Sequence, residues 1–259
     1  MTLPAPWLRF VRAYGTDLAY WYQPKGLAVT VESVFERLKV LREFEGTRPW
    51  GQCQSDYLKR LREDDISLAE GSALARMLKQ VMTVLGLAWV DTADLVEITP
   101  AGNEFLDSTN RAELLATQSL RYQFWNPAIG SRSLQPIRLH PVPFLVRVLQ
   151  SLDGNLSNVE YILFVARARQ FSDADRVAEQ IESFRRLSEA QRAEVVKKCD
   201  AFALGGPKRA SLYNTIRLNR TYAYKMWNLS GLFEFDEESN LALKRSALRG
   251  PVRDYVDDY

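Results

Sequence analysis

Polar side chains recur at helical spacing in the C-terminal half of the chain, and their chemistry suits the recognition of base edges. Asn214, Arg217, Thr221 and Lys225 follow one another at intervals of three or four residues, so they share one face of a helix. An arginine can form two hydrogen bonds with guanine, and an asparagine can form two with adenine. A lysine instead positions a phosphate. This stripe is therefore a candidate for base and phosphate contact.

Further polar and basic residues extend the candidate surface. Lys208 and Arg209 precede the same helix, where free backbone N–H groups attract a phosphate. In the first half, a helix predicted over 73–85 turns its polar side chains away from its apolar face. We predict DNA contacts for Arg76, Lys79, Gln80, Lys208, Arg209, Asn214, Arg217, Thr221 and Lys225.

One pattern places these residues, and it occurs twice. Each copy has an amphipathic helix with basic residues, a short apolar strand, a polar tip and a second strand, over 71–98 and again over 208–243. This order is typical of a winged-helix module, whose usual partner is duplex DNA. The pattern predicts a mainly α fold with short β-hairpins (α+β), built as two tandem winged-helix subdomains. The alternative is a small helical domain whose charges are only a solvated helix surface.

The first subdomain is predicted over 1–125, after a leader that contains Trp21. Apolar spacing and breakers predict helices over 31–44, 52–62 and 73–85, with Ser72 as the N-cap of the third. Strands are expected over 87–90 and 95–98 around a turn-rich tip. Thr99 and Pro100 then begin another helix, and a further helix is predicted over 114–124.

A linker is predicted over 126–141, where Pro127, Gly130 and Pro136 interrupt the chain. The second subdomain follows over 142–259, with helices over 143–152, 156–166, 173–187, 189–203 and 210–228. Ser157 or Asn155 is the predicted cap of the second of these helices, and the last is predicted to bury Leu212, Ile216, Ala223 and Trp227. Strands over 232–235 and 241–243 form the second hairpin. Its tip carries Glu237 and Glu238, which would repel a phosphate, so no contact is predicted there.

Composition bounds these expectations. The chain has 259 residues, 46% of them hydrophobic and 25% charged, which is enough for two domains with cores of their own. Its net charge of +2 gives no bulk attraction for a polyanion, so affinity must come from local patches. Cys53 and Cys199 belong to no CxxC pair. Without a signal peptide or a membrane-length apolar run, a cytoplasmic location is expected.

The residues of a nuclease site are missing from the sequence. No Asp-x-Lys or Glu-x-Lys occurs, although a site that holds a divalent metal for phosphodiester hydrolysis needs acidic groups beside a lysine. His140 is the single histidine, and Gly205 to Lys208 lack the spacing of a phosphate-binding loop. We therefore predict no catalytic residue, no metal ligand and no cofactor for this chain alone.

Several short blocks of the sequence resemble the N-terminal recognition region of the type IIS restriction and nicking endonucleases of the AlwI family. The blocks occur in the family's order, over about residues 20 to 245. They are Leu38 to Gly46 with Trp50, Arg76-Met77 with Leu85-Gly86, Ile98 to Gly102, Gln118 to Gln123 with Asn126-Pro127, Pro143 to Leu145, and Leu229 to Phe233.

The resemblance implies two winged-helix subdomains that bind a short asymmetric site in double-stranded DNA. In the parent enzymes this region is joined to a PD-(D/E)xK nuclease domain that needs Mg²⁺. The chain stops about where that domain would begin, so a nuclease domain or subunit is the second expected partner, and Mg²⁺ is expected only there. A winged-helix protein-interaction subunit and a transcriptional regulator are the alternative functions.

Overall fold

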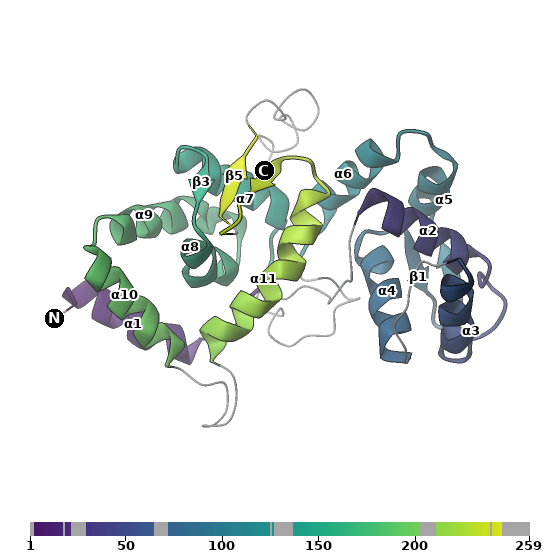
Figure 1. The fold of residues 1–259 in the computed structure, drawn as a ribbon, viewed down its shortest axis with the longest axis horizontal. Coiled ribbons are helices and arrows are strands. Elements are labelled where there is room, and N and C mark those ends of the chain that lie inside the picture. The colour runs from purple at the N-terminus through teal and green to yellow at the C-terminus, as the bar shows by residue number, and fades with distance from the viewer. Residues whose placement is uncertain are drawn as a thin grey trace.

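The computed structural model describes residues 3–17, 19–21, 30–64, 72–124, 126, 137–201, 211–238 and 240–244. Within them the chain is mainly helical with two small antiparallel sheets (Figure 1), which confirms the predicted α+β class. The first half contains α1 (Ala5–Thr16), α2 (Val31–Arg42), α3 (Trp50–Glu63), α4 (Ser72–Val84), β1 (Ala88–Val90), β2 (Val96–Ile98), α5 (Pro100–Asp107) and α6 (Arg111–Arg121). The second half contains α7 (Pro141–Ser151), β3 (Asn155–Leu156), α8 (Asn158–Leu163), the 3-10 turns η2 (Val165–Arg167) and η3 (Phe171–Asp173), α9 (Ala174–Arg185), α10 (Glu189–Asp200), α11 (Leu212–Asn228), β4 (Phe233–Phe235) and β5 (Leu241–Leu243).

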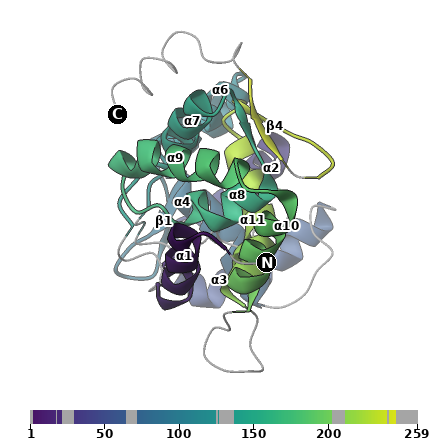
Figure 2. The same cartoon turned by 90° about the vertical axis from the view of Figure 1, so that its left-hand side faces the viewer.

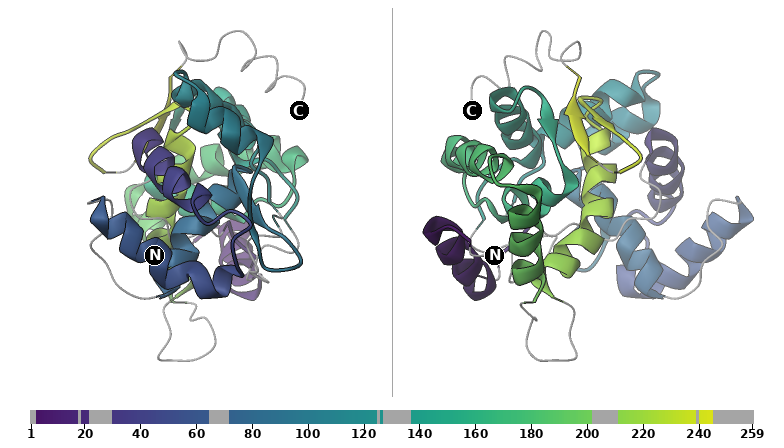
Figure 3. Two further views of the ribbon diagram at one scale, coloured as in Figure 1. Left: turned by 90° about the vertical axis from the view of Figure 1, so that its right-hand side faces the viewer. Right: turned by 60° about the vertical axis from the view of Figure 1, so that its left-hand side comes forward.

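The two halves share a plan in which a third helix leads into a hairpin. In the first half α2, α3 and α4 pack together and β1 pairs with β2, Val90 lying opposite Val96. In the second half α11 leads into β4 and β5, with Phe235 opposite Leu241. Figure 3 shows the blue helices of the first half set apart from the green α9 and α10, with α11 between them. The predicted repeat of helix and hairpin is present in both halves.

The two halves also resemble each other in how a further segment pairs with the hairpin. A segment that follows the first helix joins the last strand of the hairpin in each half. In the first half Glu45 forms a parallel bridge with Val96, and in the second half β3 pairs antiparallel with β5. The second half also inserts α9 and α10 between its second helix, α8, and its third, α11.

Helix α1 lies in the predicted leader, yet it packs on the second half of the chain. Its Trp7 contacts the rings of Phe164 and Phe184, and Figure 2 shows α1 beside α10. Trp21, 1% exposed, also lies there, because its backbone N–H donates to Ala166 and its indole N–H to Ala168. The N-terminal residues therefore help to hold the elements around α11.

An aromatic cluster around Trp21 anchors the end of α11. The indole ring of Trp21 contacts Phe124, Phe144, Tyr161 and Trp227, with centroid distances between 5.5 and 6.2 Å. These rings come from the segment after α6, from α7, from α8 and from α11. Because each large ring buries much apolar surface, the cluster is a core that several elements share.

Several segments differ from the sequence-based expectation. The helix predicted over 114–124 lies at Arg111–Arg121, and Phe124 instead forms a bridge with Leu139. Ser72 is the first residue of α4 rather than its N-cap. The helix predicted over 156–166 begins later, at Asn158, because Asp153 and Gly154 adopt positive φ angles of 55° and 87° and turn the chain so that β3 can pair with β5. Ser157 then begins α8 with a reciprocal capping box. The helix ends at Leu163, and the 3-10 turn η2 follows.

Gly102 allows α5 to pack directly on the hairpin. Thr99 caps α5, as predicted, and its hydroxyl accepts a hydrogen bond of 3.0 Å from the Gly102 N–H. A Cβ atom at position 102 would lie 2.0 Å from the carbonyl oxygen of Leu87 and 2.8 Å from a methyl group of Ile98. Glycine is therefore required for this close approach.

Helix length and polarity also bear on membranes. In the part of the chain that the structure describes, no helix is long and apolar enough to cross a bilayer.

Candidate nucleic-acid interface

Helix α4 presents its predicted contact residues at different depths. Arg76 is exposed, and its Nη1 lies 3.5 Å from the side-chain oxygen of Gln54 on α3. The ammonium group of Lys79 lies 5.5 Å from the centre of the Trp50 ring. Burial lowers the pKa of Lys79, and the negative charge of Asp94 offsets this effect only in part. Arg76 is thus the more accessible of these two cations.

Gln80 is partly buried on the same helix, while the apolar face of α4 meets the core as predicted. Leu74, Leu78, Val81 and Leu85 are all at most 5% exposed. The structure therefore places Arg76, Lys79 and Gln80 off the packed face, and of these three only Arg76 is exposed.

Helix α11 is held in place by its apolar face and its N-cap. Ser211 caps it, because its hydroxyl accepts a hydrogen bond of 3.0 Å from the N–H of Asn214. The side chains predicted to be buried, which are Leu212, Ile216, Ala223 and Trp227, are each 1% exposed. A helix fixed in this way holds its outer face at a defined position.

The predicted stripe lies on that outer face. Arg217 and Thr221 are exposed, and Asn214 and Lys225 are partly buried. The side-chain oxygen of Asn214 accepts hydrogen bonds from Arg217 Nε at 3.1 Å and from Arg217 Nη2 at 2.7 Å. The structure thus brings these two candidates together. Lys208 and Arg209 lie outside the described residues.

Leu218 belongs to the same face and was missed by the sequence reasoning. Its exposed fraction is 58%, and it follows Asn214 by four residues and precedes Thr221 by three. The signal was available, because Leu218 lies two residues after Ile216 and so falls outside the buried stripe of the helix. An exposed leucine between polar side chains can contact the methyl group of thymine.

The second hairpin has an acidic tip. Asp236 accepts hydrogen bonds from the backbone and side chain of Asn240, and these bonds hold the pKa of Asp236 below its usual value. Glu237 and Glu238 are exposed beside it. Because these carboxylates would repel a phosphate, the absence of a phosphate contact at this tip stays a prediction.

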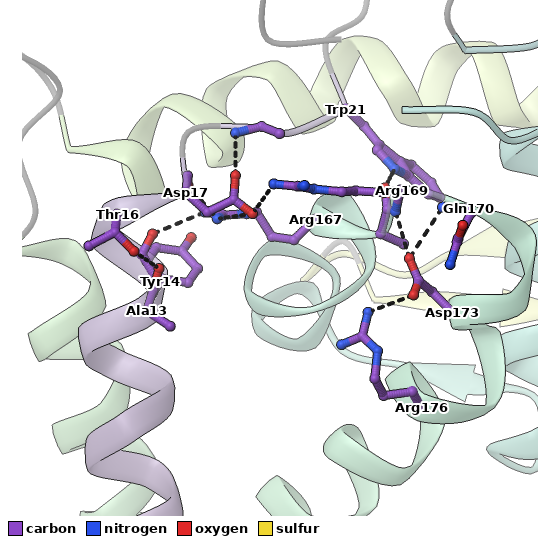
Figure 4. Close-up of polar contacts among 12 residues, drawn as sticks. Ala13, Tyr14, Thr16, Asp17, Trp21, Arg167, Arg169, Gln170, Asp173 and Arg176 are labelled. Atoms are coloured by element: carbon purple, nitrogen blue, oxygen red, sulfur yellow. Dashed lines mark hydrogen bonds and ion pairs between the residues drawn. The ribbon is translucent and has the colours of Figure 1, made fainter. Parts of the chain in front are cut away.

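An arginine-rich network joins the end of α1 to the 3-10 turns (Figure 4). Arg167 donates to the backbone oxygens of Tyr14 and Asp17, and Arg169 forms an ion pair of 2.6 Å with the Asp17 carboxylate. Asp173 pairs with Arg176 at 3.0 Å. A cavity of about 610 Å³ opens beside the network. The carboxylates of Asp17 and Asp173 offset the charges of the neighbouring arginines. Because Asp17 directly follows α1, its contacts with Arg167 and Arg169 attach α1 to the second half.

A cavity of about 1160 Å³ lies between the α9–α10 pair and the sheet of the second half. Its lining is mostly apolar, and the buried carboxylate of Glu160 forms an ion pair of 2.8 Å with Arg185 at its wall. Of the predicted DNA-contact residues that the structure describes, none lines this cavity. The candidate interface is therefore an outer helix face rather than this cavity.

The histidine and the two cysteines lie at positions that suit structural roles. His140 is the N-cap residue of α7, and partial burial lowers its pKa. Cys53 and Cys199 are buried free thiols, and burial raises the pKa of the Cys199 thiol to about 12. Among the described residues, no three His, Cys, Asp or Glu side chains are grouped so that they could hold a metal ion.

Comparison with solved structures identifies a protein of similar fold. A crystal structure of the BpuJ1 endonuclease binding domain, in complex with pyrene- and phenanthrene-modified DNA, superposes with a TM-score of 0.59. The match covers 93% of this chain and 84% of that chain at 12% sequence identity. This chain has the fold of that binding domain.

Sequence comparisons give no closer relation. No family model matches the chain, and no curated protein matches it. The resemblance to the AlwI family therefore stays a prediction. The relation to the BpuJ1 endonuclease binding domain rests on the shared fold, which extends over almost the whole chain.

Proposed function

We propose that this chain binds double-stranded DNA at a specific, short, asymmetric sequence. In this proposal it is the recognition domain or subunit of a type IIS restriction or nicking endonuclease of the AlwI family. The observation that carries the proposal is the outer face of α11, where Asn214 and Arg217 are joined by two hydrogen bonds. The likeness to a binding domain crystallised with DNA supports it.

Two winged-helix units would read the site. In both halves the third helix leads directly into a hairpin, and a segment after the first helix joins the last strand of that hairpin. The third helix of such a unit enters the major groove. Helix α4 would present Arg76, and α11 would present Asn214 and Arg217. Their contacts would distinguish bases, whereas Lys225 would position a phosphate.

The difference between the two halves of the chain supports an asymmetric site. A palindromic DNA site mirrors the two-fold symmetry of a protein dimer. Here the two reading helices belong to one chain and carry different side chains, and the second half contains the additional helices α9 and α10. One chain of this kind would read two different half-sites.

The nuclease chemistry is assigned to another domain or subunit, which would also bind Mg²⁺. We expect the purified chain to leave supercoiled plasmid intact in the presence of Mg²⁺. Nicking or linearisation that co-purifies with the wild-type chain, and that disappears on adding a chelator, would contradict this assignment.

Selection from a randomised duplex library tests the proposed function. The purified chain is incubated with the library at two salt concentrations, and the retained duplexes are sequenced. Recovery of one short asymmetric motif is the expected result. Affinity should fall with salt by a slope of about −0.9 for each neutralised phosphate.

Two substitutions make this test specific to α11. Arg217→Ala and Asn214→Ala should abolish enrichment of the motif. The matched control is Arg147→Ala, since Arg147 is exposed on α7 and forms an ion pair with Asp175. If no motif is recovered and neither α11 variant changes retention, the interaction-subunit and regulator alternatives take precedence.

A further inference from the structure

Arg220 has a guanidinium group without a polar partner in the described part of the chain. It lies on α11, its side chain is partly buried, and its Nε and Nη1 atoms are buried and make no hydrogen bond. Its Cζ lies 5.5 Å from the centre of the Tyr224 ring. Buried polar groups are nearly always hydrogen-bonded, and an unpaired buried charge is costly. Arg220 therefore keeps hydrogen-bond donors that a further polar group can use.

A cavity of about 240 Å³ opens at Arg220. Its described lining consists of Arg220, Thr221, Tyr224, Lys225, Asn228 and Phe235. This lining contains two cationic side chains, a hydroxyl and an amide, and none of these six residues is acidic. A water molecule takes about 30 Å³, so the cavity has room for a small oxyanion with several waters.

The aromatic wall gives the cavity a fixed shape. The rings of Tyr224 and Phe235 lie 4.6 Å apart, between centroids, at an angle of 31°. Burial raises the pKa of Tyr224, so its phenol keeps the proton that it can donate. The hydroxyl of Tyr224 is itself buried without a hydrogen-bond partner. Asp236, whose charge acts on Tyr224, is already bonded to Asn240.

We propose that this cavity binds a phosphate group, with Arg220 as its principal cationic partner. Guanidinium groups bind phosphate through charge-assisted hydrogen bonds, and Lys225 adds a second positive charge. Thr221 and Lys225 belong both to this cavity and to the outer stripe of α11. A DNA strand that follows the stripe would therefore pass the mouth of the cavity.

This inference rests on the proposed function for the source of the phosphate, which is the DNA backbone. Free phosphate has the same chemistry, so the experiment must separate the two sources. Arg220→Met removes the charge and keeps an apolar side chain against Tyr224. Arg220→Lys keeps the charge, and Arg147→Met removes an exposed arginine on α7 as a control.

The first measurement compares thermal stability with DNA affinity. Because Arg220→Met removes an unpaired buried charge, it should raise the melting temperature of the free protein by a few degrees. It should also reduce the salt slope of DNA binding by about 0.9, equally for specific and unrelated duplexes. Arg220→Lys should keep most of the slope. A purely structural role for Arg220 would instead lower the melting temperature.

The second measurement locates the phosphate. Duplexes with a single neutral methylphosphonate at successive positions are bound to wild type and to Arg220→Met. One position should weaken wild type severalfold and leave Arg220→Met unchanged. In parallel, the melting temperatures of both proteins are followed during titration with inorganic phosphate.

The outcomes separate the two proposals. If the chain binds no DNA but phosphate stabilises wild type and not Arg220→Met, the proposed function fails and the cavity takes a free phosphate. If DNA binds but no methylphosphonate position depends on Arg220 and phosphate stabilises both proteins equally or neither, the phosphate site is overturned. A phosphate effect that Arg147→Met also removes would overturn it as well.

Discussion

The side-chain oxygen of Asn214 accepts two hydrogen bonds from Arg217, from Nε at 3.1 Å and from Nη2 at 2.7 Å. The two residues are three positions apart on α11, where side chains are neighbours. Asn214 thereby orients the planar guanidinium of an exposed arginine before any ligand arrives. Because ordering a long side chain costs free energy on binding, this contact lowers the cost of using Arg217.

We expect Asn214→Ala and Arg217→Ala to be non-additive. Each should weaken specific DNA binding by about 1–3 kcal/mol, the range for a bidentate base contact. The double variant should lose less than the sum, because residues in contact couple by about 0.5–3 kcal/mol. Fluorescence anisotropy measures the affinity of wild type, both single variants and the double variant for the selected duplex. Strict additivity would show that the two side chains act separately.

Arg217→Lys is the matched control for charge. Lysine keeps the positive charge but lacks the planar fork. Binding to unrelated duplexes should remain near the wild-type level, while the preference for the selected motif falls. An Arg217→Lys variant with unchanged preference would assign Arg217 to a phosphate contact.

Leu218 should recognise the methyl group of a thymine. Replacing each dT of the selected site by deoxyuridine in turn removes only that methyl group. At one position this replacement should weaken the binding free energy of wild type by about 0.8 kcal/mol, which is the contribution of one buried methylene group. Leu218→Ala should bind both duplexes equally there. If wild type tolerates deoxyuridine at every position, Leu218 has no such contact.

Gly102→Ala should destabilise the first half. The new Cβ would lie 2.0 Å from the carbonyl oxygen of Leu87, so α5 must move away from the hairpin. Overpacking of this kind costs about 1–3 kcal/mol, which denaturant unfolding can measure. Gly51→Ala is the control, since a Cβ there meets nothing closer than 3.6 Å and alanine favours a helix. Equal effects would exclude close packing as the cause.

Stability should fall in acid through Asp17. Partial burial raises the pKa of Asp17, but the Ala19 N–H bond and the charges of Arg167 and Arg169 outweigh it, so the pKa lies below its usual value. A lowered folded-state pKa gives stability that is complete above the unfolded pKa of about 3.9 and is lost as the pH falls through the folded value.

Asp17→Asn tests this dependence. The difference in unfolding free energy between wild type and Asp17→Asn should be largest above about pH 4 and shrink below it. Urea unfolding at a series of pH values provides the measurement. Asp175→Asn is the control, because Asp175 forms an exposed ion pair with Arg147. If the difference in unfolding free energy between wild type and Asp17→Asn stays unchanged in acid, the Asp17 carboxylate is not its source.

Local signals predicted much of the fold. Thr99 before Pro100 predicted the start of α5, and Ser157 was one of two predicted caps for α8. The apolar spacing of α11 predicted its buried face, because helical periodicity depends only on neighbours along the chain. The repeated hairpins were predictable for the same reason.

Long-range contacts were the part that could not be predicted. Strand β3 has two residues and exists by pairing with β5, more than eighty residues away. Helix α1 lies in the predicted leader, although Trp7, Val11 and Tyr14 have helical spacing. Its position depends on Phe164 and Phe184, which no local pattern connects to it. Such pairings depend on the tertiary fold.

The candidate site was predictable in composition but not in geometry. The stripe that contains Asn214, Arg217 and Thr221 follows from spacing alone. The bond between Asn214 and Arg217 depends on the choice of side-chain rotamers, and the cavity at Arg220 depends on the space that α11 and β4 leave unfilled. The sequence shows which groups share a face, whereas packing decides which of them have partners.

Helix α6 packs against α2 and α5 of the first half and against α7 of the second half. It therefore links the half that contains α4 to the half that contains α11. One added base pair between two half-sites moves the second by about 3.4 Å and turns it by roughly 35° about the DNA axis. If both helices read DNA as proposed, this linkage would select a single spacing, and a duplex lengthened by one base pair at its centre would keep contact with only one of the two helices.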